Sequence, residues 1–165
     1  MGERLKGKVA LVTGAGSIGP GWGNGKATSV LFAREGAKVF AVDLNPEAAE
    51  ETRALIEREG GVCRTHQADV AKAAGVQRMV VACMEAFDRV DLVVNNVGIA
   101  ITGGAVETSE ADWDRVHDVN LKSVWLVCRQ VLPIMQRQGK GAIVNIASIA
   151  AHRWTGVNYV SYYAT

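Results

Sequence analysis

The strongest constraint on the fold is a glycine-rich stretch close to the start of the 165-residue chain. Apolar residues 9–12 are followed by six glycines between Gly14 and Gly25, and apolar residues then recur at helical spacing over 27–33 until Gly36. Four apolar residues bounded by charge indicate a buried parallel strand. Glycine has no Cβ, and a helix N-terminus presents free N–H groups, so this order of strand, loop and helix lets the backbone approach an anion. The segment therefore predicts a binding site for a pyrophosphate.

A second apolar strand, residues 39–42, ends in Asp43, which lies 18 residues beyond Gly25. An acidic residue at about this distance is expected to accept hydrogen bonds from the ribose hydroxyls of an adenosine. Asp43 is also a common type of turn residue, because residues 43–46 read Asp-Leu-Asn-Pro. With the loop and the spacing both present, we favour dinucleotide binding. NAD is expected rather than NADP, because the carboxylate would repel a 2′-phosphate and no arginine or lysine follows it.

Composition narrows the class of protein. The formal net charge of +1 gives no electrostatic indication of nucleic acid or of an anionic membrane as a partner. No apolar run approaches the roughly 18 residues of a membrane span, and residues 1–6 lack the apolar region of a signal peptide. The three cysteines and three histidines are scattered, so we expect reduced core thiols and no metal site. The expectation is a cytoplasmic protein with one domain over residues 1–165. The cysteines are Cys63, Cys83 and Cys128.

The alternation of apolar runs and helical patterns predicts an α/β fold with a doubly wound parallel sheet. Ligands of such sheets bind beyond the carboxyl ends of the strands, where Asp43, Asp69, Asn95–Asn96 and Ser148 are expected to gather with the glycine loop. The five expected strands cover residues 9–12, 39–42, 62–66, 90–94 and 141–147, and the expected helices cover 46–59, 76–87 and, with a break, 109–138.

The last of these helices is apolar on more than one face around residues 119–131. One face can cover the sheet, so the second predicts contact with another copy of the chain, as a homo-oligomer. The stripe of residues 76–87 contains two methionines, and we assign it to the core.

Several short motifs recur in an order typical of one family. They are Thr13-Gly14 through Gly25, Asp69-Val70, Asn95-Asn96-Val97-Gly98, Asn120 within Val-Asn-Leu-Lys-Ser, and Ser148 after the fifth strand. From residue 8 to the last residue the chain resembles the short-chain dehydrogenases/reductases with a single Rossmann-like domain. The resemblance implies hydride transfer between a nicotinamide cofactor and a secondary alcohol or ketone. It implies cofactor contacts from Gly14, Ser17, Ile18, Gly23, Gly25, Asp43, Asp69, Val70, Asn96 and Gly98.

The resemblance also implies three catalytic residues. Ser148 would donate a hydrogen bond to the substrate oxygen, Asn120 would help position a water of a proton relay, and a tyrosine would act as the general acid/base. The family pattern is Tyr-x-x-x-Lys, in which the lysine lowers the tyrosine pKa. Tyr159 is excluded because Tyr163 lies four residues on, and Tyr163 lies further from Ser148, so we choose Tyr162. Considered alone, each residue also has a structural interpretation. Asn120 could be a buried amide with satisfied hydrogen bonds, Ser148 could cap or turn the chain after a strand, and Tyr162 could be an aromatic residue of the core.

The chain departs from the family pattern in three ways. The glycine loop is about five residues longer, and we align Gly23-Asn24-Gly25 with the family's Gly-x-Gly, although Ile18-Gly19 is an alternative. Val97 stands where alanine is usual. No lysine follows Lys140, so we expect the 165 residues to be the first two-thirds of a longer subunit. The rival interpretation is a dinucleotide-binding module or fragment without turnover.

Overall fold

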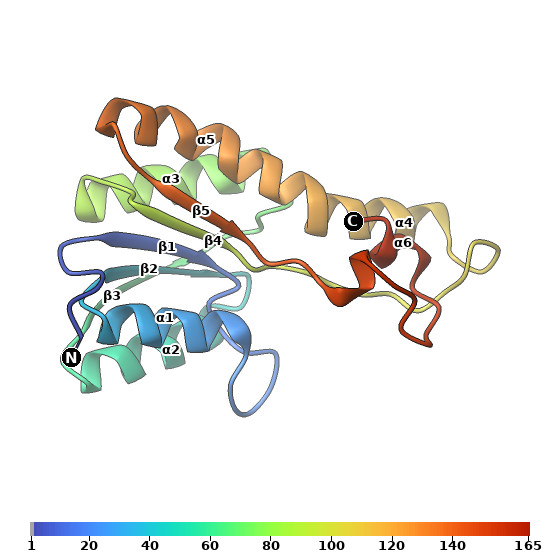
Figure 1. Cartoon of the computed structure of the whole chain (residues 1–165), viewed down its shortest axis with the longest axis horizontal. Helices are drawn as coiled ribbons and strands as arrows, with labels where there is room; N and C mark the ends of the chain where they lie inside the picture. Colours follow the sequence, from blue (N-terminus) through green and yellow to red (C-terminus); the bar gives the residue numbers. More distant parts are fainter. Residues whose placement is uncertain (1) are drawn as a thin grey trace.

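A five-stranded parallel sheet forms the centre of the computed structural model, which describes residues 2–165 (Figure 1). The strand order is β3-β2-β1-β4-β5, so the direction of winding reverses between β1 and β4. In β1, Leu11 pairs with Phe40 on one side and with Val93 on the other. The reversal opens a crevice at the carboxyl ends of β1 and β4. The strands are β1 Val9–Thr13, β2 Lys38–Asp43, β3 Val62–Gln67, β4 Leu92–Asn95 and β5 Ala142–Asn145.

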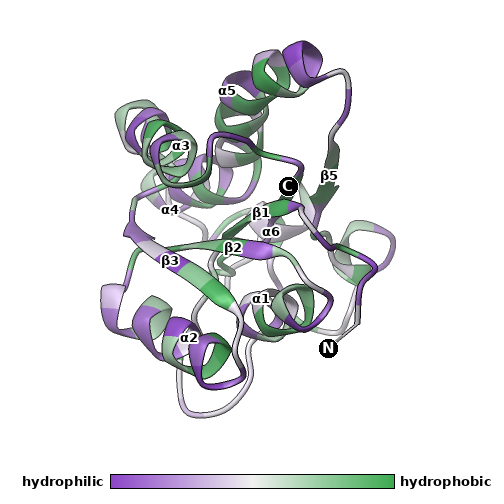
Figure 2. Ribbon diagram, turned by 90° about the vertical axis from the view of Figure 1, so that its left-hand side faces the viewer, coloured by the Kyte–Doolittle hydropathy of each residue, from purple (hydrophilic) through white to green (hydrophobic). Residues whose placement is uncertain are grey.

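Helices cover both faces of this sheet, which confirms the predicted doubly wound α/β fold. Helices α1 and α2 pack on one face, and α3 and α5 on the other (Figure 1). Along α2, hydrophilic and hydrophobic residues are mixed (Figure 2), and the buried ones are Ala48, Ala49, Thr52 and Ile56. The helices are α1 Asn24–Arg34, α2 Pro46–Arg58, α3 Ala73–Phe87, α4 Glu110–His117, α5 Ser123–Gln138 and α6 Val160–Tyr163, with a π-helical turn at Asp118–Lys122 and a 3₁₀ turn at Ile149–Ala151.

Two elements follow the sequence closely. Strand β1 is buried along its whole length, and in α3 the side chains of Val76, Met79 and Cys83 are fully buried, so the core assignment of that stripe is confirmed. Helix α2 begins as predicted, because the Asn45 side chain accepts hydrogen bonds from the backbone N–H groups of Glu47, at 3.0 Å, and of Ala48, at 3.4 Å.

Two expectations need correction. The apolar residues whose spacing predicted helix α1 do not all lie on its buried face, because Leu31 is 47% exposed and the buried residues are Gly25, Ser29, Val30 and Ala33. The small residues let α1 lie close to the sheet, so a longer side chain has no room there. Strand β5 was expected over residues 141–147 but pairs only from Ala142 to Asn145. It is the edge strand, and Val144 is half exposed there.

The predicted break in the long helix is a π-helical turn, Asp118–Lys122. It joins α4 to α5 without interrupting the helical direction (Figure 1). Such turns are frequent at functional sites, because the extra residue re-aims a side chain. Asn120 lies in the middle of this turn.

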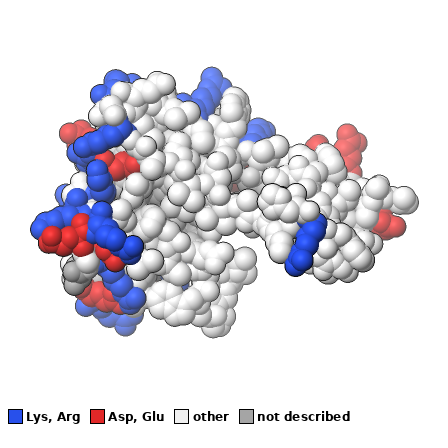
Figure 3. Space-filling model, viewed as in Figure 1, with Lys and Arg blue, Asp and Glu red and all other residues white. Residues whose placement is uncertain are grey.

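Most of the charged side chains visible in Figure 3 gather at one end of the molecule, with fewer at the other end and a largely uncharged surface between them. At the charged end, Arg34 pairs with Glu59 at 2.6 Å and Arg89 with Asp91 at 2.6 Å. The carboxyl ends of the strands lie away from these pairs. Within residues 2–165, no helix is both long and apolar enough to cross a membrane.

Candidate dinucleotide site

A cavity of about 720 Å³ lies at the carboxyl ends of the strands. Five segments line it: the glycine loop, the ends of β2 and β4, the connection from β3 to α3, and the turn that follows α4. The structure brings all ten predicted cofactor residues into its lining, although they come from positions as far apart as Gly14 and Gly98. A cavity of this size suits a small organic ligand.

The start of the glycine loop is packed too tightly for side chains. Gly14 has φ +62°, and a Cβ on Gly25 would lie 1.8 Å from the Gly14 carbonyl oxygen. The same oxygen accepts a hydrogen bond from Asn96 Nδ2 at 3.0 Å, and the Asn96 N–H donates to Thr13 Oγ1 at 3.2 Å. These contacts fix the N-terminus of α1 against the ends of β1 and β4, so its free N–H groups lie at the cavity.

Asp43 holds the loop as well as lining the cavity. Its Oδ2 accepts a hydrogen bond from the Gly16 N–H at 2.9 Å, and its Oδ1 accepts one from the Asn45 N–H at 3.0 Å. Each carboxylate oxygen has lone pairs beyond the one that these bonds use, so both remain able to accept from a ligand hydroxyl. Asp43 can therefore stabilise the turn at residues 43–46 and still accept hydrogen bonds from a ligand.

The longer loop lies at the rim of the cavity. Ile18 is fully exposed and Trp22 is 60% exposed, yet Ile18 also lines the cavity. Lys26 lies over the Trp22 ring at 5.9 Å from the ring centroid and pairs with Glu51 at 3.4 Å. Helix α1 begins immediately after Gly23, so Gly23-Asn24-Gly25 stands at the helix start and Ile18-Gly19 precedes it in the loop.

Asn120 is a satisfied amide at the edge of this site. Its Oδ1 accepts from the Ile99 N–H at 2.8 Å, and its Nδ2 donates to the Ile99 carbonyl at 2.9 Å and to Thr165 Oγ1 at 3.1 Å. Thr165 Oγ1 in turn donates to the Tyr162 carbonyl at 3.2 Å. Asn120 therefore links a lining residue, Ile99, to the short helix that carries Tyr162.

The three proposed catalytic residues lie outside the lining of the cavity. Ser148 caps the 3₁₀ turn, and its Oγ accepts from the Ala150 N–H at 3.1 Å, which leaves its own hydrogen free to donate. Tyr162 is half buried in α6, with its ring edge-on to that of Tyr159. Within residues 2–165 the Tyr162 hydroxyl has no hydrogen-bond partner.

Sequence reasoning missed several lining residues, most clearly Arg115 and Val119. Arg115 lies in the last turn of α4, and Val119 lies four residues further on, in the π-helical turn, so a helical sequence places them on one face. Val119 directly precedes Asn120. The i, i+4 spacing of Arg115 and Val119 was the sequence feature that could have identified both as lining residues. Arg115 is the one cation among the described lining residues, which also include Asp43 and Asp69. The other missed positions include Asn24, Leu44, Asn45, Ala68 and Ile99.

The thiols lie away from this chemistry. Cys63 and Cys83 are buried, and burial raises the pKa of each to about 12. Cys128 is only partly buried, which corrects its assignment to the core, and burial is again the main cause that raises its pKa. Within residues 2–165 there is no group of three or more His, Cys, Asp or Glu side chains arranged to hold a metal ion.

Comparison with known proteins decides the family, because the family model described as short chain dehydrogenase matches residues 8–165. The chain belongs to the short-chain dehydrogenase family. It is 45% identical to D-threitol dehydrogenase of Mycolicibacterium smegmatis over 148 residues, which are 90% of this chain and 55% of that protein. The family resemblance inferred from the motifs is thus confirmed, and the chain spans little more than half the length of this relative.

Solved structures of the family have the same fold. A Burkholderia xenovorans structure described as a short-chain dehydrogenase/reductase superposes with a TM-score of 0.96 at 49% identity, over 98% of this chain and 64% of that one. A 7α-hydroxysteroid dehydrogenase complexed with NADH and 7-oxo glycochenodeoxycholic acid superposes with a TM-score of 0.91 at 30% identity, over 98% of this chain and 60% of that one.

Proposed function

We propose that this chain supplies the dinucleotide site and the acid/base residues of an NAD-dependent oxidoreductase that interconverts a secondary alcohol and a ketone. The observation that carries the proposal is the cavity lined by all ten predicted cofactor residues. The names of the D-threitol and 7α-hydroxysteroid dehydrogenases support alcohol and ketone chemistry, and the NADH bound to the latter supports a nicotinamide cofactor.

The residues present fit such a cofactor. Gly14 and Gly25 leave no room for a Cβ, and the N-terminus of α1 faces the cavity, which suits a pyrophosphate. Asp43 would accept hydrogen bonds from the adenosine ribose hydroxyls, and its negative charge favours NAD over NADP. When bound, the nicotinamide would supply the acceptor or donor of the hydride.

The proton chemistry falls to the chain itself. A substrate hydroxyl must lose its proton as hydride leaves the adjacent carbon, so a general base is required. We assign this to Tyr162, whose phenol needs a neighbouring cation to act near neutral pH, because free tyrosine titrates near 10. Ser148 would donate its free hydrogen to the substrate oxygen. Asn120, with one Oδ1 lone pair in use, would accept a hydrogen bond from a water of the relay.

The choice of Tyr162 is supported by the hydrogen bonds of its neighbour. The Tyr163 hydroxyl is within hydrogen-bond distance of three groups, namely the Thr155 N–H at 2.9 Å, Thr155 Oγ1 at 2.8 Å and the Val157 carbonyl at 2.8 Å. A phenol has one donor and two acceptor positions, so this hydroxyl is fully used.

The test is oxidation of a panel of neutral secondary alcohols by the complete natural protein with NAD, followed by the absorbance of NADH. Tyr162→Phe should lower kcat by about 10²–10⁴-fold, because it removes the general base. Tyr159→Phe serves as the matched control on the same segment and should keep full activity. Equal activity in wild type and Tyr162→Phe would contradict the assignment.

A second candidate function is dinucleotide binding without turnover. It is favoured by the separation just described, in which the ten binding residues line the cavity and Asn120, Ser148 and Tyr162 do not. Tight NADH binding by a natural protein that oxidises none of the alcohols would support this alternative.

The proposal includes a homo-oligomer and a cytoplasmic location, with no nucleic acid or membrane as a partner. The outer face of the π-helical turn and α5 supports the first, because Leu121, Trp125 and Leu132 are each about half exposed while the inner face of α5 is buried. Sedimentation of the purified protein as a monomer would contradict it. The free cysteines are compatible with a reducing compartment.

A further inference from the structure

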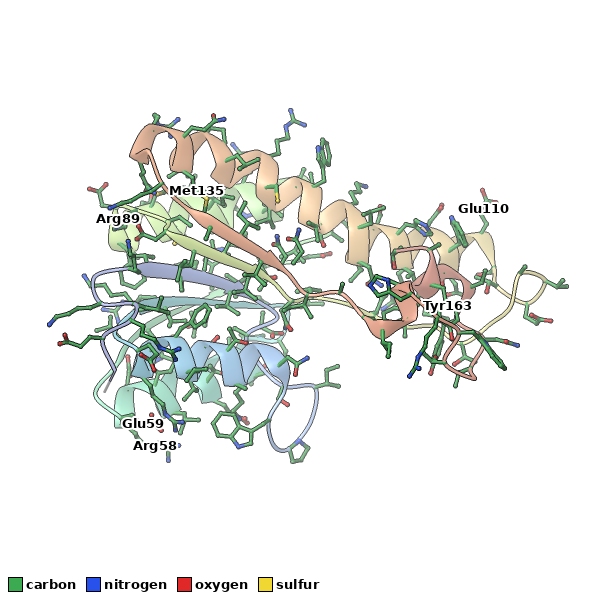
Figure 4. All side chains as sticks on the ribbon, viewed as in Figure 1. Arg58, Glu59, Arg89, Glu110, Met135 and Tyr163 are labelled. Carbon is green, nitrogen blue, oxygen red and sulfur yellow. The ribbon has the colours of Figure 1, made fainter. Side chains whose placement is uncertain are left out.

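Arg115 is a residue of the cavity to which the proposed function gives no role. It lies in the last turn of α4 and is the one cation among the described residues that line the cavity. Figure 4 shows Glu110, the first residue of α4, at the end of the molecule opposite Arg58, Glu59 and Arg89. Helix α4 therefore projects beyond the carboxyl ends of the strands, and its last turn forms part of the cavity wall.

The guanidinium of Arg115 is not neutralised by the chain itself. The nearest following carboxylate, that of Asp118, pairs instead with Lys122 at 2.9 Å. Among the described residues the Arg115 side chain makes no hydrogen bond and no ion pair, and the residue is exposed. A cation that lines a cavity and has no partner in the protein can bind a ligand without breaking an existing interaction.

Arg115 stands at the end of the cavity that adjoins the start of α3. In the turn that follows it, the hydrogen bond from Lys122 is the main cause that lowers the pKa of Asp118, and the charge of Lys72 adds to this effect. Lys72 is the N-cap residue of α3 and closely follows Asp69–Val70, which line the cavity. The wall that carries Arg115 therefore meets the wall formed by the connection from β3 to α3.

The strand order places the base of a bound dinucleotide at the same end. In the proposed function the pyrophosphate lies at the start of α1, which follows β1, and the adenosine ribose lies at Asp43, at the end of β2. The base extends beyond the ribose and thus continues from β2 toward β3. Apolar side chains line that part of the cavity, and the carboxylate of Asp69 there would repel a phosphate. The apolar residues are Leu44, Ala68 and Val70.

We propose that Arg115 binds the adenine base of the dinucleotide by packing its planar guanidinium against the face of the ring. The inference rests on the proposed function. A guanidinium stacks on aromatic faces, and its charge is attracted by their π-electrons. Arg115 takes no part in hydride or proton transfer, so it contributes to the affinity for the cofactor and leaves the chemical step unchanged.

The first experiment measures the dissociation constants of NADH, ADP and adenosine with the complete natural protein. NADH is followed by its fluorescence, and the other two by competition with NADH. Arg115→Ala should weaken the binding of all three by the same factor, about five- to tenfold, because they share the base. Arg137→Ala is the matched control, since it removes an exposed arginine of α5 that does not line the cavity, and it should bind all three as wild type does.

The second experiment separates stacking from charge. Arg115→Lys keeps the charge but not the plane, so it should bind NADH nearly as weakly as Arg115→Ala does. During oxidation of a secondary alcohol, both variants should raise the KM for NAD and change kcat by less than about twofold. Thermal unfolding of each variant verifies that it is folded.

The outcomes separate the two proposals. A wild-type protein that binds neither NADH nor NADPH overturns the proposed function and with it this inference. A wild type that binds NADH, with equal affinity in Arg115→Ala, overturns this inference alone. Weaker binding of ADP with unchanged binding of adenosine would show that Arg115 contacts a phosphate, and full affinity in Arg115→Lys would show that charge alone matters. Either result contradicts the proposal.

Discussion

At the scale of single residues, polar side chains in and near the cavity hold backbone groups in place and keep part of their hydrogen-bonding capacity unused. Asp43 accepts from the Gly16 N–H, and Asn96 donates to the Gly14 carbonyl, while both line the cavity. Ser148 caps a turn with its oxygen and keeps its hydrogen. A structural role for such a residue is therefore no argument against a functional one, because each bond uses only part of its hydrogen-bonding capacity.

Asp91 is a residue whose role is structural, and it predicts a dependence of stability on pH. It is buried, accepts from two nitrogens of Arg89 at 2.6 and 2.7 Å and from the Val9 N–H at 2.9 Å, and the hydrogen bond from Arg89 is the main cause that lowers its pKa below 3.8. A lowered pKa in the folded state stabilises the fold above about pH 4, and this contribution is lost as pH falls through the folded-state pKa.

Asp91→Asn should therefore lower the free energy of unfolding by about 1–3 kcal/mol near neutral pH. The difference from wild type should shrink below about pH 4, where the wild-type carboxyl also becomes protonated. Urea unfolding of both proteins over a pH series measures it. Exposed carboxylates with a lowered pKa, such as Glu59, are present in both proteins, so their effect on the free energy of unfolding cancels in the difference between wild type and Asp91→Asn. A difference that stays constant down to pH 2 would contradict this account.

At the scale of elements, the glycine loop and α1 form the unit on which the dinucleotide site depends. Gly25→Ala should destabilise the protein by about 3 kcal/mol or more and abolish NADH binding, because the new Cβ would lie 1.8 Å from a backbone oxygen. Gly19→Ala is the matched control for stability, since a Cβ there has nothing within 4 Å and the position has no positive φ. Thermal unfolding measures both, and equal midpoints would refute the packing argument.

The sequence was sufficient where local chemistry determines an element. The buried run of β1, the Asn45-Pro46 start of α2 and the stripe of α3 each follow from residue type and spacing. The sequence was insufficient where tertiary packing determines which residues are buried or where a strand ends. The buried face of α1 depends on how closely the helix approaches the sheet, and the pairing of β5 ends at Asn145 because its partner β4 ends at Asn95.

The same limit applies to the site. The ten residues predicted to contact a cofactor line one cavity, because the motifs that contain them follow strands and the sheet brings the ends of those strands together. Arg115 and Val119 were missed, since their place in the lining depends on how α4 and the π-helical turn after it lie against the sheet. The three bonds of the Tyr163 hydroxyl depend on a loop conformation that no spacing rule describes.

At the scale of the whole molecule, the winding reversal between β1 and β4 is what places the five lining segments around one cavity. The pairs Arg34–Glu59 and Arg89–Asp91 lie at the opposite end of the molecule. The charged lining residues of the cavity, within the described chain, are Asp43, Asp69 and Arg115. The central claim is that this cavity binds a dinucleotide and that Asp43 selects the one without a 2′-phosphate.

Titration of the protein with NADH and with NADPH, followed by fluorescence, tests that claim most directly. We expect NADH to bind at least about tenfold more tightly than NADPH, a difference of about 1.4 kcal/mol. Asp43→Asn should narrow this ratio, because asparagine still accepts the Gly16 N–H but carries no charge. Binding of neither dinucleotide, or an equal preference that Asp43→Asn leaves unchanged, would contradict the account.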